Sequence, residues 1–213
     1  MSGAIVSSPS EDAVMGRDEA EVDRICRTIR AIGEAGIDRT LFYPLDRAMH
    51  IYEFDATKPR VLTPGGQGWE EILTFFRRVV GVADEAGVKL ANHVWDVPLM
   101  TAIIDEVPSP NNGITYCQGM YIIEGDSYKA VSDWGVDRIF FSHARTEVRH
   151  GPRFEDYEEV PLDRGDVDIA ECMRILHEAG YDGVVAPEHL GAAQSGDPMG
   201  DAVAYLKGVL GRL

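Results

Sequence analysis

Several short apolar runs in this chain end in a side chain that can bind a metal, and this repetition constrains the fold more than any other feature. Residues 114–116 lead directly to Cys117, and residues 139–141 lead to His143. Polar, acidic sequence separates the two runs and is long enough for a loop and a helix. Buried strands that carry reactive side chains at their carboxyl ends and alternate with helices are typical of parallel α/β barrels.

Two further segments have the same form. Residues 88–95 carry His93 toward their end, and residues 184–190 carry Glu188 and His189. Because the carboxyl ends of parallel strands lie at one edge of a sheet, four such ends would bring a thiol, imidazoles and a carboxylate together. We therefore predict one divalent metal ion at this edge. Its predicted ligands are His93, Cys117, His143 and Glu188.

The spacing of apolar residues between these runs predicts helices, so that strands and helices alternate along the chain. The expected strands are 4–7, 40–44, 88–95, 114–116, 139–141 and 184–190, and the expected helices are 18–35, 69–86, 167–179 and 201–210, with at most a short one at 100–104. We predict an α/β fold, a TIM-barrel-like parallel (β/α) barrel in a single domain over residues 1–213. A regular barrel has eight strands, and this one is expected to be incomplete, with about six. Residues 146–166 are expected to form a long loop.

An excess of acidic residues excludes one class of partner. The chain has 36 Asp and Glu against 20 Lys and Arg, which gives a net charge of −16. Nucleic-acid binding needs clustered basic residues and is therefore not expected. No apolar run approaches the ~20 residues needed to cross a membrane. The three cysteines are irregularly spaced and the start of the chain lacks the basic residues of a signal peptide, so a reducing cytoplasm is expected.

Two more side chains near the predicted strand ends are candidates for chemistry. Arg145 lies two residues beyond His143 and points the same way along its strand, so it could hold a substrate carboxylate in a bidentate contact. The alternative for Arg145 is a surface salt bridge. Asp96 follows the strand that carries His93, and it is either part of the site or a solvated loop acid.

Several motifs, in the same order along the chain, resemble the mannonate dehydratase family of the xylose-isomerase-like TIM-barrel group. GITYCQG at 113–119 is similar to that family's GLTFCTG, and IFFSHAR at 139–145 is similar to its IHFVHLR. LANHVWDVP at 90–98 resembles LALHPDDPP, and APEHLG at 186–191 resembles RPDHG. The similarity extends over nearly the whole chain from about residue 4.

The resemblance implies a lyase that removes water from a sugar acid, converting D-mannonate to 2-keto-3-deoxy-D-gluconate. In that reaction His189 would transfer the proton and Arg145 would orient the substrate carboxylate, with Asp96 as a third catalytic candidate. It also implies that the ion is Mn²⁺. The predicted thiolate and imidazole ligands by themselves would equally suit Zn²⁺, Fe²⁺ or Co²⁺.

The chain also departs from the family pattern. Glu188 stands where the family has Asp, Pro44 where it has Asn, and Trp95 replaces a polar residue. The family's first two βα units have no counterpart. Two alternatives to the lyase therefore stay open: a sugar isomerase or epimerase of the same group, or a non-catalytic remnant that binds a metal and a sugar acid. Because an open sheet has unpaired edges, we expect a homodimer or a larger homo-oligomer.

Overall fold

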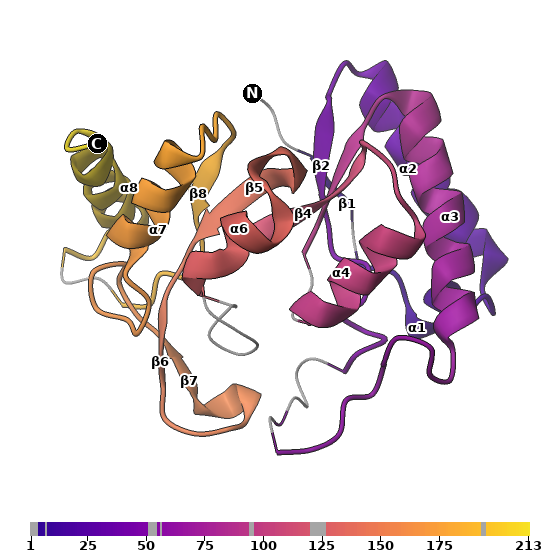
Figure 1. Ribbon diagram of the computed structural model, residues 1–213, viewed down its shortest axis with the longest axis horizontal. Helices are drawn as coiled ribbons and strands as arrows, with labels where there is room; N and C mark the ends of the chain where they lie inside the picture. The colour runs from indigo at the N-terminus through magenta and orange to yellow at the C-terminus, as the bar shows by residue number, and fades with distance from the viewer. Residues whose placement is uncertain are drawn as a thin grey trace. The chain divides into compact units, whose positions relative to one another are not determined.

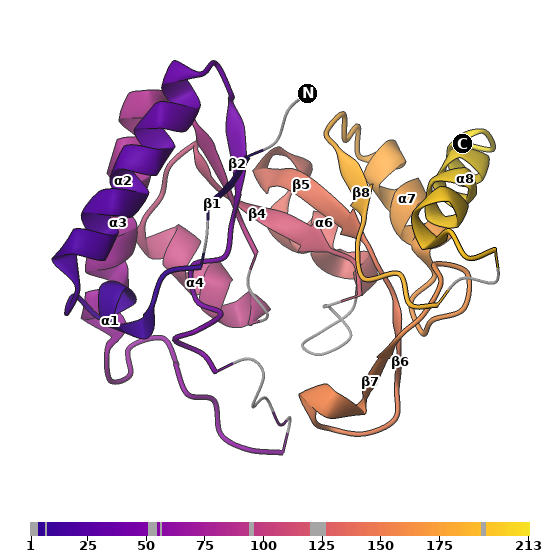
Figure 2. The ribbon, with the colours of Figure 1, turned by 180° about the vertical axis from the view of Figure 1, so that it is seen from behind.

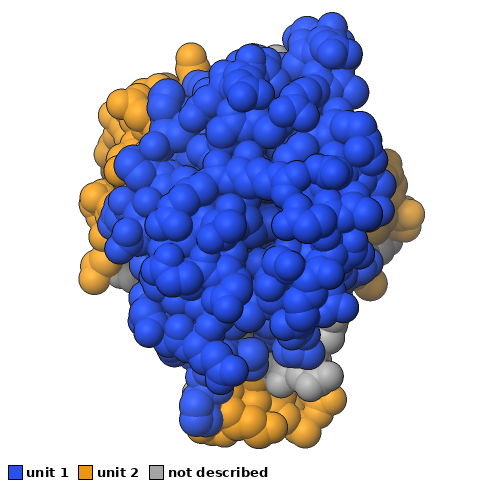
Figure 3. Space-filling model, turned by 90° about the vertical axis from the view of Figure 1, so that its right-hand side faces the viewer, with its two compact units in different colours: residues 1–51, 59–115 blue, residues 52–58, 116–213 orange. Residues whose placement is uncertain are grey.

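The computed structural model describes residues 4–6, 8–50, 55, 57–93, 96–119, 127–192 and 195–213. Residues 7, 94 and 95, including the predicted departure at Trp95, lie outside them. The chain divides into two compact units (Figure 3). Unit 1 comprises Met1–Ile51 and Pro59–Thr115, and unit 2 comprises Tyr52–Lys58 and Tyr116–Leu213. That residues 1–213 form a single domain stays a prediction.

Strands alternate with helices along the chain, as the hydrophobic pattern predicts (Figure 1). The described strands form a six-stranded sheet in the order β1-β2-β3-β4-β5-β8. Parallel pairing joins β1 to β2, β2 to β3, β3 to β4 and β5 to β8. These strands are β1 (Ala4–Val6), β2 (Arg39–Phe42), β3 (Lys89–Asn92), β4 (Asn112–Cys117), β5 (Ile139–Ala144) and β8 (Val185–Pro187). The prediction of a parallel sheet with about six strands is confirmed.

Two long amphipathic helices, α2 (Glu19–Glu34) and α3 (Trp69–Ala86), pack side by side in unit 1 (Figures 1 and 2). Asp18 begins α2, because its side chain accepts a hydrogen bond from the backbone N–H of Glu21 at 3.0 Å. Gly87, with a φ of 65°, ends α3 in the left-handed conformation that glycine adopts readily. The apolar face of α3 is buried and consists of Trp69, Ile72, Leu73, Phe75, Phe76, Val79, Val80, Val82 and Ala83.

The helix α4 (Val97–Glu106) of unit 1 is longer than the sequence suggests. Its N-cap is Asp96, which accepts a hydrogen bond from the backbone N–H of Leu99 at 2.8 Å, and Pro98 lies in its first turn. Both are favourable at a helix start, so the helix begins three residues before the predicted one. The four-residue helix α1 (Glu11–Val14) also lies in a segment without a predicted helix.

In the described part of unit 2, three α-helices accompany β5 and β8: α6 (Ala130–Trp134), α7 (Ile169–Glu178) and α8 (Pro198–Leu210). Between β5 and α7 the structure corrects the prediction of a loop over 146–166. Strands β6 (Glu147–Arg149) and β7 (Tyr157–Glu159) form an antiparallel pair there, with Glu147 opposite Glu159. Strands of three residues are too short for an alternation pattern to be recognised.

None of the described helices is both long and apolar enough to cross a membrane.

Candidate metal centre

Backbone hydrogen bonds of unit 2 bring three of the predicted ligands to neighbouring strand ends. Cys117 is the last residue of β4, His143 is the fifth residue of β5, and Glu188 directly follows β8. The N–H of Gln118 donates to the carbonyl of His143 at 3.0 Å, and the N–H of Glu188 donates to the carbonyl of Ala144 at 3.1 Å. The parallel register therefore aligns the carboxyl ends of these strands, as the sequence predicts.

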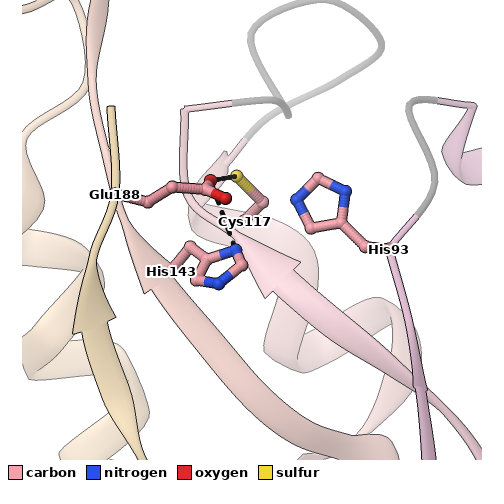
Figure 4. Close-up of side chains that lie close together, drawn as sticks. All are labelled: His93, Cys117, His143 and Glu188. Atoms are coloured by element: carbon pink, nitrogen blue, oxygen red, sulfur yellow. Dashed lines mark hydrogen bonds and ion pairs between the residues drawn. The ribbon is translucent and has the colours of Figure 1, made fainter. Parts of the chain in front are cut away.

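The side chains of these three residues are close enough to share an ion. Glu188 Oε2 lies 3.7 Å from Cys117 Sγ and 3.3 Å from His143 Nδ1 (Figure 4). Neighbouring ligand atoms on one divalent ion lie roughly 3.0–3.7 Å apart when each bond is about 2.0–2.3 Å long. The separations in unit 2 therefore fit a common ion.

His93 follows β3 in unit 1, where its backbone N–H donates to the carbonyl of Phe42 at 2.7 Å. The centroid of its ring lies 4.8 Å from the ring centroid of Tyr43, and His93 is buried. His93, Cys117, His143 and Glu188 each offer one ligand atom such that the four atoms lie within 4.8 Å of one another (Figure 4). Among the residues that the structure describes, the four predicted from separate strand ends thus form a group that could hold a metal ion.

Burial also sets the protonation state of His143 in a way that suits a ligand. Loss of solvent, helped by the positive charge of Arg145, lowers the pKa of His143 to about 4. The imidazole is therefore neutral at pH 7, which is the form that binds metals. Burial raises the pKa of Glu188, whereas Arg145 and Cys117 act in the opposite direction. A positive ion beside Glu188 would offset the cost of burying its charge.

Arg145 lies among carboxylates of the chain itself. Its side chain is only 6 % exposed and forms an ion pair with Glu159 through Nη2. Glu147 Oε2 lies 3.7 Å from its Nε, and Glu188 Oε2 lies 3.7 Å from its Nη1. Burial alone would lower the pKa of Arg145, but Cys117 and the three glutamates raise it, so the guanidinium is firmly charged. Its predicted contact with a substrate carboxylate stays a prediction.

Glu147 and Glu159 are residues of this region that the sequence analysis missed. Glu147 is 1 % exposed, and burial raises its pKa to about 7. Its side chain lies against Gly119, where an added Cβ would overlap Glu147 Oε2. Glu147 continues the alternation of His143 and Arg145 along one face of an extended chain, and this spacing could have found it. Glu159 belongs to β7, which has only three residues, so no local sequence pattern identifies it as part of the site.

His189, the predicted proton carrier, lies beside this cluster with its side chain 55 % exposed. Its Nδ1 is 3.7 Å from Glu159 Oε1, and its Nε2 is 4.0 Å from Glu188 Oε1. Its backbone φ is 48°, in the left-handed region that a non-glycine residue occupies at a cost of about 1 kcal/mol or more. Burial and the charge of Arg145 both lower the pKa of His189. Its role as proton carrier is not tested by these contacts.

Asp96, the third catalytic candidate, has structural contacts in unit 1. One carboxylate oxygen caps α4, and the other forms an ion pair with Arg60. The residue is 1 % exposed. A catalytic role for Asp96 therefore also stays a prediction, and the structure adds a structural role that the sequence analysis did not foresee.

Comparison with known proteins places this arrangement in a family. A mannonate dehydratase of Chromohalobacter salexigens is 31 % identical over 180 residues, which cover 76 % of this chain and 43 % of that protein. The chain spans about two fifths of the length of the curated relatives it matches.

Solved structures show the same fold. A mannonate dehydratase from Streptococcus suis serotype 2 superposes with a TM-score of 0.72 at 19 % identity, covering 97 % of this chain and 76 % of that one. A xylose isomerase-like TIM barrel/4-hydroxyphenylpyruvate dioxygenase fusion protein superposes with a TM-score of 0.68 at 16 % identity, covering 97 % and 33 %. The prediction of an incomplete TIM-barrel-like α/β fold with about six strands is confirmed for the described residues.

The family model for D-mannonate dehydratase (UxuA) matches residues 65–202, which is more than half of the chain. The matched segment contains each of the four candidate ligands. The predicted resemblance is confirmed, and this chain belongs to the D-mannonate dehydratase family.

Proposed function

We propose that the protein is a metal-dependent hydro-lyase that removes water from a sugar acid, D-mannonate, to give 2-keto-3-deoxy-D-gluconate. The observation that carries this proposal is the thiol, imidazole and carboxylate set at the strand ends, inside the segment that matches the D-mannonate dehydratase family. We propose His93, Cys117, His143 and Glu188 as the ligands and Mn²⁺ as the ion. A bound divalent ion supplies Lewis-acid polarisation of the substrate oxygens beside the carbon that loses its proton.

The side chains around the ligands take the remaining roles. His189 carries the proton, because its side chain is more than half exposed, and burial and the charge of Arg145 lower its pKa, so that the neutral imidazole can accept a proton. Arg145 adds a permanent positive charge next to Glu188 and orients the substrate carboxylate. Asp96 supports the site by fixing the start of α4 directly after the strand that delivers His93.

The ligand set also separates the proposal from one alternative. Isomerases and epimerases of the same fold use proton abstraction too, and their cores are similar in backbone to this chain. A thiolate ligand such as Cys117 favours the lyase, because carboxylates and histidines suffice for the isomerase chemistry. The other alternative is a non-catalytic protein that retains metal and sugar-acid binding. Two departures from the family pattern favour it: Glu188 in place of Asp, and Pro44 in place of Asn.

One assay distinguishes these functions. The purified chain, loaded with Mn²⁺ and in parallel with Zn²⁺, Fe²⁺ or Co²⁺, is incubated with a panel of hexonates, uronates and ketoses. The lyase predicts formation of a 2-keto-3-deoxy acid from D-mannonate, and an isomerase predicts products from a ketose or uronate alone. His189→Ala should lower turnover by roughly 10²–10⁴-fold while the metal content stays unchanged. Full activity of His189→Ala would show that another group carries the proton, and binding without turnover would identify the non-catalytic form.

A further inference from the structure

The antiparallel pair β6–β7 brings a carboxylate that the proposed reaction does not yet use next to Arg145 and His189. Glu159 is the last residue of β7, and its side chain is 29 % exposed. Its Oε1 faces two groups at once: it forms the ion pair with Arg145 Nη2, and it lies 3.7 Å from His189 Nδ1. A carboxylate held from one side by a buried guanidinium has little freedom to move, so its other contacts are defined as well.

The backbone beyond His189 is fixed against the same strand end. Gly191 has a φ of 59°, and a Cβ added there would overlap the carbonyl oxygen of Glu159 and lie 2.8 Å from Val160 Cα. Only glycine fits this close approach at that φ. Together with the left-handed conformation of His189, it shows that the turn 189–191 is held in an unusual shape by packing on β7. Strand and turn therefore place Glu159 and His189 opposite each other.

We propose that Glu159 is a positioning residue that orients the imidazole of His189, accepting a hydrogen bond from Nδ1 and thereby leaving the lone pair on Nε2. The inference rests on the proposed function for the catalytic use of His189, but the orientation itself does not depend on any activity. At 3.7 Å the contact is longer than a hydrogen bond, and such bonds are often long before substrate is present.

The consequence is chemical, because it decides which nitrogen handles the proton. In a neutral imidazole one nitrogen carries the hydrogen and the other carries the lone pair. With hydrogen on Nδ1, the basic atom is Nε2, which lies 4.0 Å from Glu188 Oε1 and so faces the candidate ligands. A proton taken from a substrate bound there would go to Nε2. Arg145 supports this arrangement by holding the Glu159 carboxylate, while its Nη1 lies 3.7 Å from Glu188 Oε2.

The test measures the tautomer of His189 directly, without any assay of activity. The full chain is labelled with ¹⁵N-histidine, and long-range ¹H–¹⁵N correlation spectra are recorded at pH 8, metal-free and with Zn²⁺. His189→Gln identifies the His189 signals. We expect the Nδ1–H tautomer to dominate in the parent protein and the Nε2–H tautomer to gain population in Glu159→Gln. The matched control is Glu158→Gln, a neighbouring exposed residue that contacts His150 at 3.0 Å.

Three outcomes overturn the inference: a dominant Nε2–H tautomer in the parent protein, an unchanged His189 signal in Glu159→Gln, or the same change in Glu158→Gln. The tautomer of His189 in the parent protein can be measured even if Glu159→Gln does not fold. With D-mannonate as substrate, Glu159→Gln should lower kcat by about 10–100-fold while metal content, measured by elemental analysis, stays the same. If the parent protein shows the expected tautomers but no turnover, the proposed function is wrong, and the positioning role of Glu159 is still supported.

Discussion

At the scale of single residues, the candidate metal centre gathers more negative than positive charge in a buried place. Glu147, Glu159 and Glu188 lie around Arg145, and Cys117 adds a group that is ionised when it binds a metal. Uncompensated buried charge is costly, so such a cluster either takes up protons or binds a cation. A divalent ion would balance the excess, which agrees with the ligand set.

Replacing the thiol should reveal its part in metal binding. Cys117→Ser exchanges a soft thiolate for a hydroxyl that stays protonated at neutral pH, and we expect metal affinity to fall by at least about tenfold. Metal content per chain after dialysis against a weak chelator gives the measurement. Cys26→Ala, which removes a buried thiol from α2, is the control and should keep the metal. Equal occupancy of Cys117→Ser and the parent protein would remove Cys117 from the ligand set.

Glu147 should make the stability of the metal-free protein depend on pH. In the folded protein the pKa of the Glu147 carboxyl is raised to about 7, mainly by burial, whereas the ordinary value is 4.5. Unfolding is therefore coupled to proton release between these values, and the stabilisation present below pH 4.5 is lost as the pH rises to about 7. The loss is on the order of 3 kcal/mol.

Urea denaturation in the presence of EDTA at pH 5 and pH 8 measures this effect. Glu147→Gln should show a smaller difference between the two pH values than the parent protein, because the amide cannot ionise. Glu158→Gln, whose side chain is exposed, should leave the difference unchanged. If Glu147→Gln has the pH dependence of the parent protein, the buried acid is not its source.

At the scale of elements, the pair β6–β7 is the part of unit 2 that builds the surroundings of the ligands. It follows β5 directly, so His143 and Arg145 of one extended segment lead into Glu147 of β6, and β7 returns with Glu159. Thr146 secures the base of the pair: its hydroxyl accepts a hydrogen bond from the N–H of Val167 at 3.2 Å. The strand ends therefore supply the ligands, and the β6–β7 pair supplies their acidic neighbours Glu147 and Glu159.

The close approach of Gly119 to this pair can be tested with a matched glycine. In Gly119→Ala the new Cβ would overlap Glu147 Oε2 and lie 2.8 Å from Arg145 Cγ, so we expect a loss of about 1–3 kcal/mol in the free energy of unfolding. Gly81, in the helix α3, has no neighbour within 4 Å of an added Cβ. Gly81→Ala should therefore stabilise the protein by about 0.5–1 kcal/mol. Denaturation midpoints compare the two, and a stable Gly119→Ala would contradict the packing described.

At the scale of the whole molecule, β1 and β8 are the end strands of the described sheet. Each pairs on one side in the described residues, and the free side of an end strand offers N–H and C=O groups to another chain. Val185, Ala186 and Pro187 of β8 are only partly buried. The net charge of −16 opposes nonspecific association, so a contact at these edges would be a specific one.

We therefore expect the chain to form a homodimer or a larger closed oligomer, most simply about a two-fold axis. Light scattering at micromolar concentration measures the mass. A value of at least twice 23.5 kDa would agree with this expectation, and a mass near 23.5 kDa would contradict it. Measurement at high salt serves as a control, because weakening the repulsion should not reduce the mass.

The sequence by itself determined the alternation of strands and helices and the four candidate ligands. Both depend on local patterns: apolar periodicity decides the element, and a side chain at a strand end keeps its place because parallel strands share one direction. The contacts of Glu159 were decided by tertiary structure alone. Glu159 meets Arg145 across 14 residues and His189 across 30, and only the pairing of β6 with β7 and the packing of Gly191 on β7 create these contacts. A local pattern carries no information about such distant partners, because the contacts exist only once the chain has folded.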